Sequence, residues 1–172
     1  MIEGVTLKDL PKNIDERGFL SEILRSDWKE FLREAAIVQF NLSYSYPDVV
    51  RAWHRHLRGQ VDYFICVDGA VKVCAYDDQE DSSTFKELDE IILSDERLQV
   101  VRVPGRLWHG YKALGVKPIK LLYGVNRLYS YKEPDEERRP WDDPSVIPKT
   151  INGKRADPRL GKPWDWFFQP FR

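Results

Sequence analysis

Three histidines hold most of the proton and metal chemistry that this sequence could perform. The chain has only three among its 172 residues, at positions 54, 56 and 109. Two of them lie in RAWHRH (51–56), where the alternation of a β-strand places His54 and His56 on one face. Imidazole titrates near neutral pH, so it can accept a proton from a substrate, and its neutral form is a common metal ligand. His54 and His56 therefore form the start of a candidate site.

Oxygen donors and the third histidine follow in an order that extends this site. Gln60 and Asp62 come after the HxH pair and again share a face, and His109 follows a Pro-Gly turn in VPGRLWHGY (103–111). The succession HxHx3Q, a turn at Gly69 and then PGx3H resembles the two-part signature of the cupin superfamily. Asp62 stands further along the chain than the signature has its carboxylate. The resemblance implies that all three histidines meet in one barrel.

The same side chains form a possible set of metal ligands. Three imidazoles with a carboxylate, or with the amide oxygen of Gln60, suit a divalent transition metal such as Zn, Fe, Mn or Ni. A protonated His56 paired with Asp62 would satisfy both groups without a metal. We therefore expect no metal cofactor, and keep as the alternative a metal held by His54, His56, Asp62 and His109.

Short strands are the elements that must position these residues. AIVQFNLSYS (36–45), LQVVRVP (98–104) and IKLLYGV (119–125) have the alternation or β-branched content of strands. In VDYFICVDGAVKVCAYD (61–77), Asp68-Gly69 is the centre of a predicted two-residue hairpin turn. That pairing puts Cys66 opposite Val71 rather than Cys74, so no disulfide is expected. Many short strands predict an all-β sandwich or barrel.

One helix and one irregular segment complete the expected architecture. SDWKEFLREA (26–35) predicts a short N-terminal helix with Ser26 as its N-cap. With the cupin resemblance, the expected fold is a single domain over residues 1–172, an all-β double-stranded β-helix or jelly-roll barrel. The barrel is expected at about 15–130, with a wrapping C-terminal segment at about 131–172.

The C-terminal segment is rich in proline and in aromatic residues. Seven of the eleven prolines fall between Pro134 and Pro170, a density that a continuous sheet does not tolerate. We expect this segment to be irregular, with the aromatic side chains of PWDWFFQPF (163–171) docked on the barrel or on a neighbouring subunit. The alternative is a wall that stacks on a base or a sugar.

Composition excludes several classes of partner. The chain has 27 basic and 28 acidic residues, a formal net charge of −1, so nothing favours nucleic acid or a membrane surface. No apolar run approaches the roughly 20 residues that cross a bilayer, and the first residues do not resemble a secretion signal. Two cysteines are too few for a disulfide framework. We expect a cytoplasmic protein.

A closer resemblance extends from residue 15 to about residue 147. The segments DERGFLSE (15–22), VVRAWH (49–54), VPGRLWHGY (103–111) and YGVNRLYSYKEPDEERRPWDDP (123–144) resemble, in order, the dTDP-4-dehydrorhamnose 3,5-epimerase family of cupins. The resemblance implies a nucleotide-sugar isomerase of dTDP-rhamnose biosynthesis. Such an enzyme moves protons next to the 4-keto group of a dTDP-4-keto-6-deoxy sugar and works as a homodimer.

The resemblance also implies roles for single residues. His54 stands at the place of the family's catalytic base, and Tyr123 and Tyr129 match tyrosines in the region of its acid. Asp157 is the candidate for the aspartate that orients the base. The implied substrate-binding residues are Arg17, Phe19, Glu22, Gln39, Asn41, Arg51, Gln60 and His109.

Three polar positions depart from the family's pattern. Asp62 replaces a lysine that helps to neutralise the enolate, His56 replaces a glutamine, and Gln79 replaces an arginine. An anion beside a developing enolate would raise the barrier. Three readings therefore stay open: a nucleotide-sugar isomerase, which we favour, a metal-dependent cupin enzyme acting on another small substrate, and a barrel that binds a sugar nucleotide without turning it over.

Overall fold

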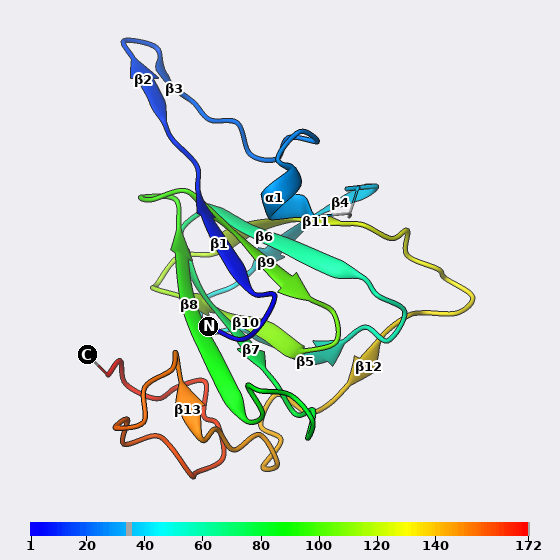
Figure 1. The fold of residues 1–172 in the computed structure, drawn as a ribbon. Coiled ribbons are helices and arrows are strands. Elements are labelled where there is room, and N and C mark those ends of the chain that lie inside the picture. The colour runs from blue at the N-terminus through cyan, green and yellow to red at the C-terminus, as the bar shows by residue number, and fades with distance from the viewer. Residues whose placement is uncertain (34–35, 172) are drawn as a thin grey trace.

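Two facing β-sheets form the body of the part of the chain that the structure describes, residues 1–33 and 36–171 of a computed structural model (Figure 1). The five-stranded sheet has the order β1 (Thr6–Asp9), β9 (Gln99–Pro104), β6 (Val61–Asp68), β11 (Ile119–Val125), β4 (Gln39–Ser45). The six-stranded sheet has the order β12 (Glu137–Arg138), β5 (Val50–Arg55), β10 (Trp108–Leu114), β7 (Ala70–Tyr76), β8 (Glu87–Ser94), β13 (Thr150–Ile151). The expected all-β class is confirmed.

The chain crosses repeatedly from one sheet to the other. β4 lies in the five-stranded sheet, β5 in the six-stranded sheet, β6 in the five-stranded sheet and β7 in the six-stranded sheet. Successive strands from β4 to β7 therefore lie in opposite sheets. This connectivity allows side chains from β5 and β6 to converge on one internal site.

The prediction of a hairpin at Asp68-Gly69 is wrong, although the chain does bend at these residues. β6 pairs with β9 and β11, whereas β7 pairs with β8 and β10, so the chain turns a corner between the sheets. Gly69 has a φ of 82°, and a Cβ there would lie 2.8 Å from Cγ2 of Ile119. A local turn signal fixes where the chain bends, but strand pairing depends on distant segments. Cys66 and Cys74 are buried and free, as expected.

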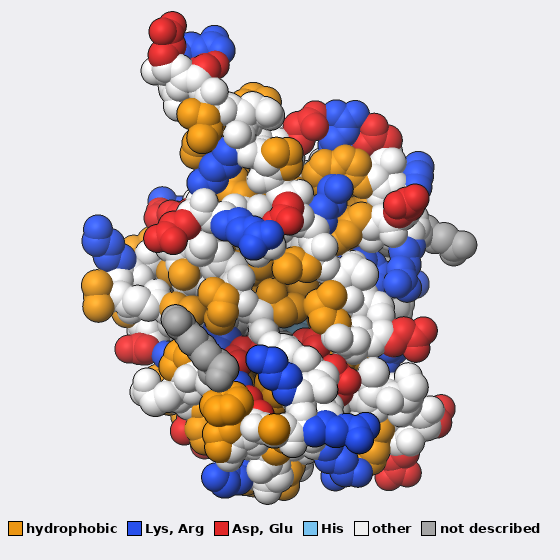
Figure 2. Space-filling model, turned by 60° about the vertical axis from the view of Figure 1, so that its left-hand side comes forward, with side chains coloured by type: hydrophobic (Ala, Val, Ile, Leu, Met, Phe, Trp, Pro, Cys, Tyr) orange, Lys and Arg blue, Asp and Glu red, His pale blue; other side chains and the backbone are white. Residues whose placement is uncertain are grey.

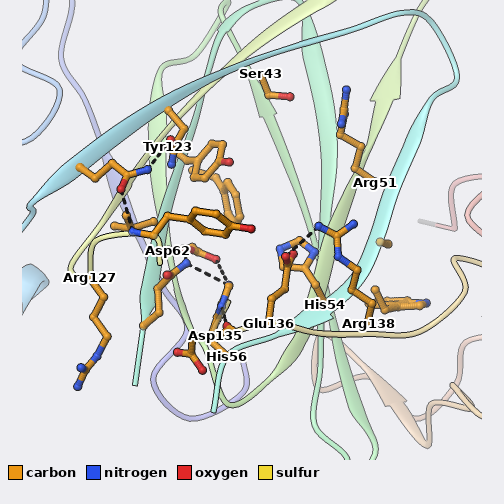
Figure 3. A pocket seen from close by; sticks show the side chains of 18 of the residues that line it. Ser43, Arg51, His54, His56, Asp62, Tyr123, Arg127, Asp135, Glu136 and Arg138 are labelled. Atoms are coloured by element: carbon orange, nitrogen blue, oxygen red, sulfur yellow. Dashed lines mark hydrogen bonds and ion pairs between the residues drawn. The ribbon is translucent and has the colours of Figure 1, made fainter. Parts of the chain in front are cut away.

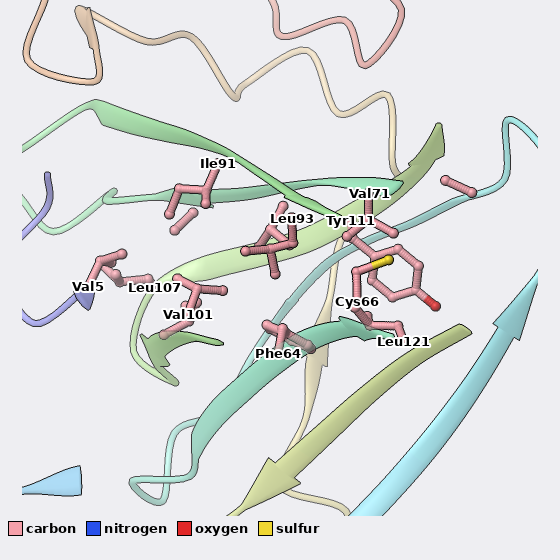
Figure 4. Close-up of a cluster of buried hydrophobic side chains, with 14 of the residues drawn as sticks. Val5, Phe64, Cys66, Val71, Ile91, Leu93, Val101, Leu107, Tyr111 and Leu121 are labelled. Atoms are coloured by element: carbon pink, nitrogen blue, oxygen red, sulfur yellow. The ribbon is translucent and has the colours of Figure 1, made fainter. Parts of the chain in front are cut away.

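The interior is apolar toward one end of the barrel and polar toward the other. Along β6 the inward side chains change from Asp62 through Phe64 to Cys66, and along β11 from Tyr123 to Leu121. The apolar end contains Val71, Leu93, Val101 and other aliphatic side chains from both sheets (Figure 4). This packed end fixes the strands that carry polar residues at the other end.

The N-terminal helix is shorter than predicted. α1 spans only Lys29–Leu32, and its N-cap residue is Trp28 without a side-chain hydrogen bond, rather than Ser26. The last two residues of the predicted helix, at positions 34 and 35, lie outside the described residues. The apolar side chains of this segment still pack on the outer face of the five-stranded sheet. There Trp28, Phe31 and Leu32 belong to one apolar cluster with Tyr63 and other residues.

The proline-rich C-terminal segment covers the outer face of the six-stranded sheet. Trp164 and Trp166 are buried there, and Trp166 packs on Trp53 of β5 with ring centroids 4.8 Å apart. The expected docking on the barrel is confirmed for these two residues, while Phe167 and Phe171 stay exposed. No helix within residues 1–33 and 36–171 is long and apolar enough to cross a membrane.

A two-stranded hairpin projects from the barrel. β2 (Asn13–Asp15) and β3 (Gly18–Leu20) pair only with each other within the described part of the chain. Figure 1 shows this hairpin standing away from the body, and Figure 2 shows charged side chains at its tip. Its apolar residues Ile14, Phe19 and Leu20 are all exposed.

Candidate functional site

A cavity of about 1210 Å³ occupies the polar end of the barrel (Figure 3). Its wall comes from β4, β5, β6 and β11, together with the segment 126–141 that follows β11. His54, His56, Asp62 and Tyr123 all line it. The cavity is therefore where the chemistry-bearing residues of both sheets meet.

The three histidines and Asp62 form one cluster, as the residue pattern predicted. His109 of β10 is the register partner of His54 of β5, and Asp62 reaches them from β6 in the facing sheet. One ligand atom from each of these residues and from His56 lies within 4.8 Å of all the others. His56 lies just beyond the end of β5, where its backbone N–H donates to the carbonyl of Gly105.

His109 is held on both sides beneath the cavity surface. Its Nδ1 lies 2.8 Å from the carbonyl oxygen of Leu107, and its Nε2 lies 2.8 Å from Oδ2 of Asp62. The His109 side chain is wholly buried, and the Asp62 side chain is 2% exposed. Asp62 also accepts a hydrogen bond from the amide of Gln60, at 2.8 Å from Oδ1.

His56 approaches the same carboxylate from the other side. Its Nδ1 bonds to the backbone carbonyl of Asp135, and its Nε2 lies 3.4 Å from Oδ2 of Asp62. Burial alone would lower the pKa of His56, but the hydrogen bond and charge of Asp62 outweigh it and raise this pKa. Burial alone would raise the pKa of Asp62, but the hydrogen bonds of His109 and His56 hold it below its ordinary value.

His54 differs from the other two histidines because its ring makes no hydrogen bond to any described residue. Its ring centroid lies 4.2 Å from that of His109, and its side chain faces the cavity. Burial, and then the neighbouring His109, lower the pKa of His54 well below its ordinary value. His54 therefore presents an imidazole whose nitrogens are available to a molecule in the cavity.

The two tyrosines named by the resemblance both line the cavity. Tyr123 lies on β11, and its ring packs on Phe64 with centroids 5.6 Å apart. Burial, and then the charge of Asp62, raise the pKa of the Tyr123 phenol. Tyr129 follows β11, and its backbone N–H donates to Oε1 of Gln39 at 3.0 Å. Both phenols are therefore placed where they could contact a bound ligand.

The polar face of β4 supplies two of the cavity's amides. Gln39, Asn41 and Ser43 point inward and line it, while the alternating apolar residues of β4 point outward. Nε2 of Gln39 donates to Oδ1 of Asn41 at 2.8 Å. Arg51 lines the cavity as the resemblance implied, and its Nε donates to Oγ of Ser45 at 3.2 Å.

The sequence pattern did not predict several of the cavity's cationic residues. Arg58, Arg127, Arg138 and Arg139 also line it. Most come from the irregular segment after β11, where no periodicity marks which side chains point inward. The charge run EERR (136–139) was the available signal, because it lies within the matched YKEPDEERRPW motif.

Five predicted site residues do not line the cavity: His109, implied as a substrate-binding residue, is wholly buried beneath its surface, and four others lie elsewhere. Arg17, Phe19 and Glu22 belong to the projecting hairpin and the residues just after it, and do not line this chain's cavity. Asp157 is a correction: its carboxylate is taken by Arg159, at 2.8 and 2.9 Å, behind the outer face of the six-stranded sheet. It does not reach the cavity, so it cannot orient His54.

Comparisons with known proteins place this geometry in a family. The family model described as dTDP-4-dehydrorhamnose 3,5-epimerase matches residues 1–152. A probable low-salt glycan biosynthesis epimerase, Agl13, of Haloferax volcanii is 47% identical over 82% of this chain and 89% of its own. The spore coat polysaccharide biosynthesis protein SpsL of Bacillus subtilis is 38% identical over 85% of this chain and 94% of its own.

A solved structure supports the same assignment. The crystal structure of NovW, a 4-keto-6-deoxy sugar epimerase of Streptomyces spheroides, has a TM-score of 0.74 and 26% identity, covering 95% of this chain and 78% of that one. This likeness confirms the expected cupin-type barrel. Taken with the family match over most of its length, it shows that the chain belongs to the dTDP-4-dehydrorhamnose 3,5-epimerase family of sugar isomerases.

Proposed function

We propose that this protein is a nucleotide-sugar isomerase that moves protons next to the 4-keto group of a dTDP-4-keto-6-deoxy sugar. The observation that carries the proposal is His54, the histidine of the cavity whose ring nitrogens no described residue occupies. The similarity to NovW, a 4-keto-6-deoxy sugar epimerase, supports the substrate class.

The proposed reaction needs a base and an acid on different sides of the sugar ring. A hydrogen on the carbon beside a carbonyl is acidic, because the electrons left behind are shared with the carbonyl oxygen as an enolate. His54 belongs to β5 of the six-stranded sheet and Tyr123 to β11 of the five-stranded sheet, so the two reach the cavity from opposite sheets. His54 accepts the proton in this proposal, and Tyr123 returns one to the opposite face.

The cavity's arginines support a nucleotide diphosphate as the other half of the substrate. Arg51 and Arg127 form no ion pair with a carboxylate of the described residues, whereas Arg58 pairs with Asp135 at 3.5 Å. A planar guanidinium that is not paired with a carboxylate suits the oxygens of a diphosphate. The amides of Gln39 and Asn41 offer hydrogen bonds to a base or sugar.

A homodimer is part of the proposal, because this chain's own cavity lacks the hairpin residues. β4 is an edge strand whose outward face is apolar and exposed, with Phe40 at 53% and Leu42 at 64%. An exposed apolar strand edge is a surface that proteins usually cover. We propose that a second copy covers β4 and that its hairpin brings Arg17 and Phe19 to this cavity.

Solvent exchange tests the reaction. The protein is incubated with dTDP-4-keto-6-deoxyglucose in deuterated water, and label at carbon 3 and carbon 5 is followed by NMR. We expect label at one or both carbons, with loss of at least about 100-fold in rate for His54→Asn, as removal of a general base gives. Tyr44→Phe is the control, because Tyr44 lies on the outward face of β4. Binding without label would leave a non-catalytic barrel.

A further inference from the structure

Arg138 stands beside the histidine that the proposed function uses as its base. β12 pairs with β5 as the terminal strand of the six-stranded sheet, and Arg138 is the register partner of His54. Residues directly opposite each other in an antiparallel pair point to the same face of the sheet. Both side chains accordingly line the cavity, and Figure 3 shows them next to each other. The sheet register therefore brings a guanidinium to the base.

The charge of Arg138 acts on the His54 ring. Burial is the largest cause of the lowered pKa of His54, and the charges of His109, His56 and Arg138 add to it. A cation beside an imidazole opposes a second positive charge on that ring. His54 therefore stays neutral before a ligand arrives, which is the form that can accept a proton.

The neighbours of Arg138 on β12 are fixed by other contacts. The carboxylate of Glu137 accepts a hydrogen bond from Nε of Arg55 at 2.6 Å. The guanidinium of Arg139 donates to Oδ2 of Asp78 at 2.7 Å. These contacts anchor the strand on both sides of Arg138, so its backbone position opposite His54 does not depend on its own side chain.

An enolate needs a positive charge that few residues of the cavity can provide. When a proton leaves the carbon beside a carbonyl, the negative charge collects on the carbonyl oxygen. Within the described part of the chain, no lysine lines the cavity. Arg58 and Arg139 are each paired with an aspartate. Arg51 and Arg127 are the residues proposed for the diphosphate. Arg138 is the remaining arginine of the cavity wall.

The ion pair that Arg138 forms with Glu136 leaves most of its donors available. One terminal nitrogen lies 2.8 Å from Oε2 of Glu136, and the Arg138 side chain is 76% exposed. An exposed pair of this kind contributes little to stability, so it holds the side chain only weakly. A guanidinium has five N–H donors. Arg138 can therefore keep its contact with Glu136 and donate another N–H to a ligand.

We propose that Arg138 is a further catalytic residue, which donates a hydrogen bond to the 4-keto oxygen and stabilises the enolate. This role rests on the proposed function. His54 takes the proton from the carbon beside the carbonyl, and the electron pair of that C–H bond moves onto the carbonyl oxygen. Tyr123 then gives a proton to the same carbon from the opposite face, and the carbonyl re-forms. Arg138 approaches from the edge of its sheet, which leaves the two faces of the sugar ring to the base and the acid.

The difference between turnover and binding tests this role. Deuterium exchange at saturating dTDP-4-keto-6-deoxyglucose gives the rate, and calorimetric titration with dTDP, which has no keto group, gives the binding. We expect Arg138→Gln to lower the exchange rate by about 100-fold or more, as loss of one oxyanion donor does. Its Kd for dTDP should stay within about threefold of the wild-type value, because the lost contact strengthens only as the enolate forms. Arg138→Lys keeps the charge and should exchange at least about tenfold faster than Arg138→Gln.

Arg97→Gln is the matched control. Arg97 is also exposed, at 72%, and paired with a carboxylate, that of Asp9, but it does not line the cavity. Neither its exchange rate nor its dTDP binding should change. Circular dichroism checks that each variant is folded.

Four outcomes would count against the proposal in different ways. Wild-type exchange in Arg138→Gln would overturn the role of Arg138, and so would equal rates in the Gln and Lys variants. Weaker dTDP binding with an unchanged saturated rate would move Arg138 to the diphosphate and overturn it as well. Absence of exchange in the wild-type protein would instead overturn the proposed function, on which the role of Arg138 depends.

Discussion

At the scale of single residues, the three histidines differ in what holds them. His56 and His109 have both ring nitrogens engaged, whereas His54 has neither engaged by a described residue. The residue pattern placed His54 and His56 on one face correctly, because strand alternation is a local property. Which ring would be free depends on Asp62, Leu107 and Asp135, which the backbone brings from other strands and loops.

Tyr123→Phe tests the assigned acid. Removing the phenol hydroxyl should lower the rate of isomerisation by about 100-fold or more, because the proton donor is lost, with little change in KM. Tyr129→Phe is the comparison, since Tyr129 also lines the cavity but is 47% exposed. Both variants are assayed by conversion of the nucleotide sugar. A larger loss in Tyr129→Phe would transfer the role of acid to Tyr129.

The contact between β5 and β10 controls the site at the scale of elements. Gly110 follows His109, and a Cβ there would lie 2.4 Å from Cβ of Ala52 and 2.5 Å from the carbonyl oxygen of Arg51. Glycine is required because the neighbouring strand's backbone is too close for any side chain. The close approach keeps His109 opposite His54.

Gly110→Ala should therefore destabilise the protein by about 3 kcal/mol, at the upper end of overpacking effects, because backbone atoms must move. Gly115→Ala is the control. A Cβ at Gly115 would meet nothing within 4 Å, so only the positive φ of 81° would make this substitution unfavourable. Urea unfolding gives both values. The double variant Ala52→Gly with Gly110→Ala should recover only part of the loss, since the Arg51 carbonyl remains. Full recovery would mean that Ala52 alone is the obstacle.

A buried carboxylate in β8 makes stability depend on pH. Burial raises the pKa of Asp89 to about 6, although the N–H of Ile2 donates to it at 2.8 Å and opposes the shift. The folded state thus binds the Asp89 proton more tightly than the unfolded state does. Its contribution to stability is greatest below pH 4, falls as pH rises toward 6, and stays low above that.

Asp89→Asn should raise the free energy of unfolding by about 2 kcal/mol at pH 8, because the amide is uncharged and its oxygen can still accept from Ile2. At pH 4.5 the gain should be much smaller, since Asp89 is then mostly protonated in the folded protein. Thermal melts at both pH values measure the difference. An equal gain at both would show that charge burial is not the cause.

Sequence reasoning was most successful where the signal is local. IKLLYGV (119–125) coincides with β11, and the alternation in 36–45 identified the inward amides of β4. It failed at Asp68-Gly69, where the bend is local but the pairing partners are not, and at Asp157, where the nearby Arg159 takes the carboxylate. Arg127 and Arg139 lie on irregular backbone and Arg138 in the two-residue strand β12, so alternation gives no direction there.

At the scale of the whole molecule, the open edge of β4 predicts the oligomeric state. Leu42→Glu places a charge on the apolar outward face of this edge strand. In analytical ultracentrifugation we expect a molecular mass of twice the 20.3 kDa chain mass for the wild-type protein and a mass of one chain for the variant. Ile92→Glu is the control, because Ile92 is 52% exposed on β8 of the other sheet. A wild-type monomer would refute the proposed dimer.

Subunit complementation tests whether the projecting hairpin completes a neighbour's cavity. A chain carrying Arg17→Ala and Phe19→Ala keeps its cavity but loses the hairpin side chains. A chain carrying His54→Asn keeps the hairpin side chains but loses the base in its cavity. If hairpins act across the dimer, each mixed dimer has one complete site, because the intact hairpin meets the intact His54. Random reassortment makes about half of the dimers mixed, so a quarter of the sites recover. We therefore expect two nearly inactive proteins to regain about a quarter of wild-type exchange after mixing and refolding. Hairpins that serve their own chain's cavity would give no gain on mixing, since neither chain then contains a complete site.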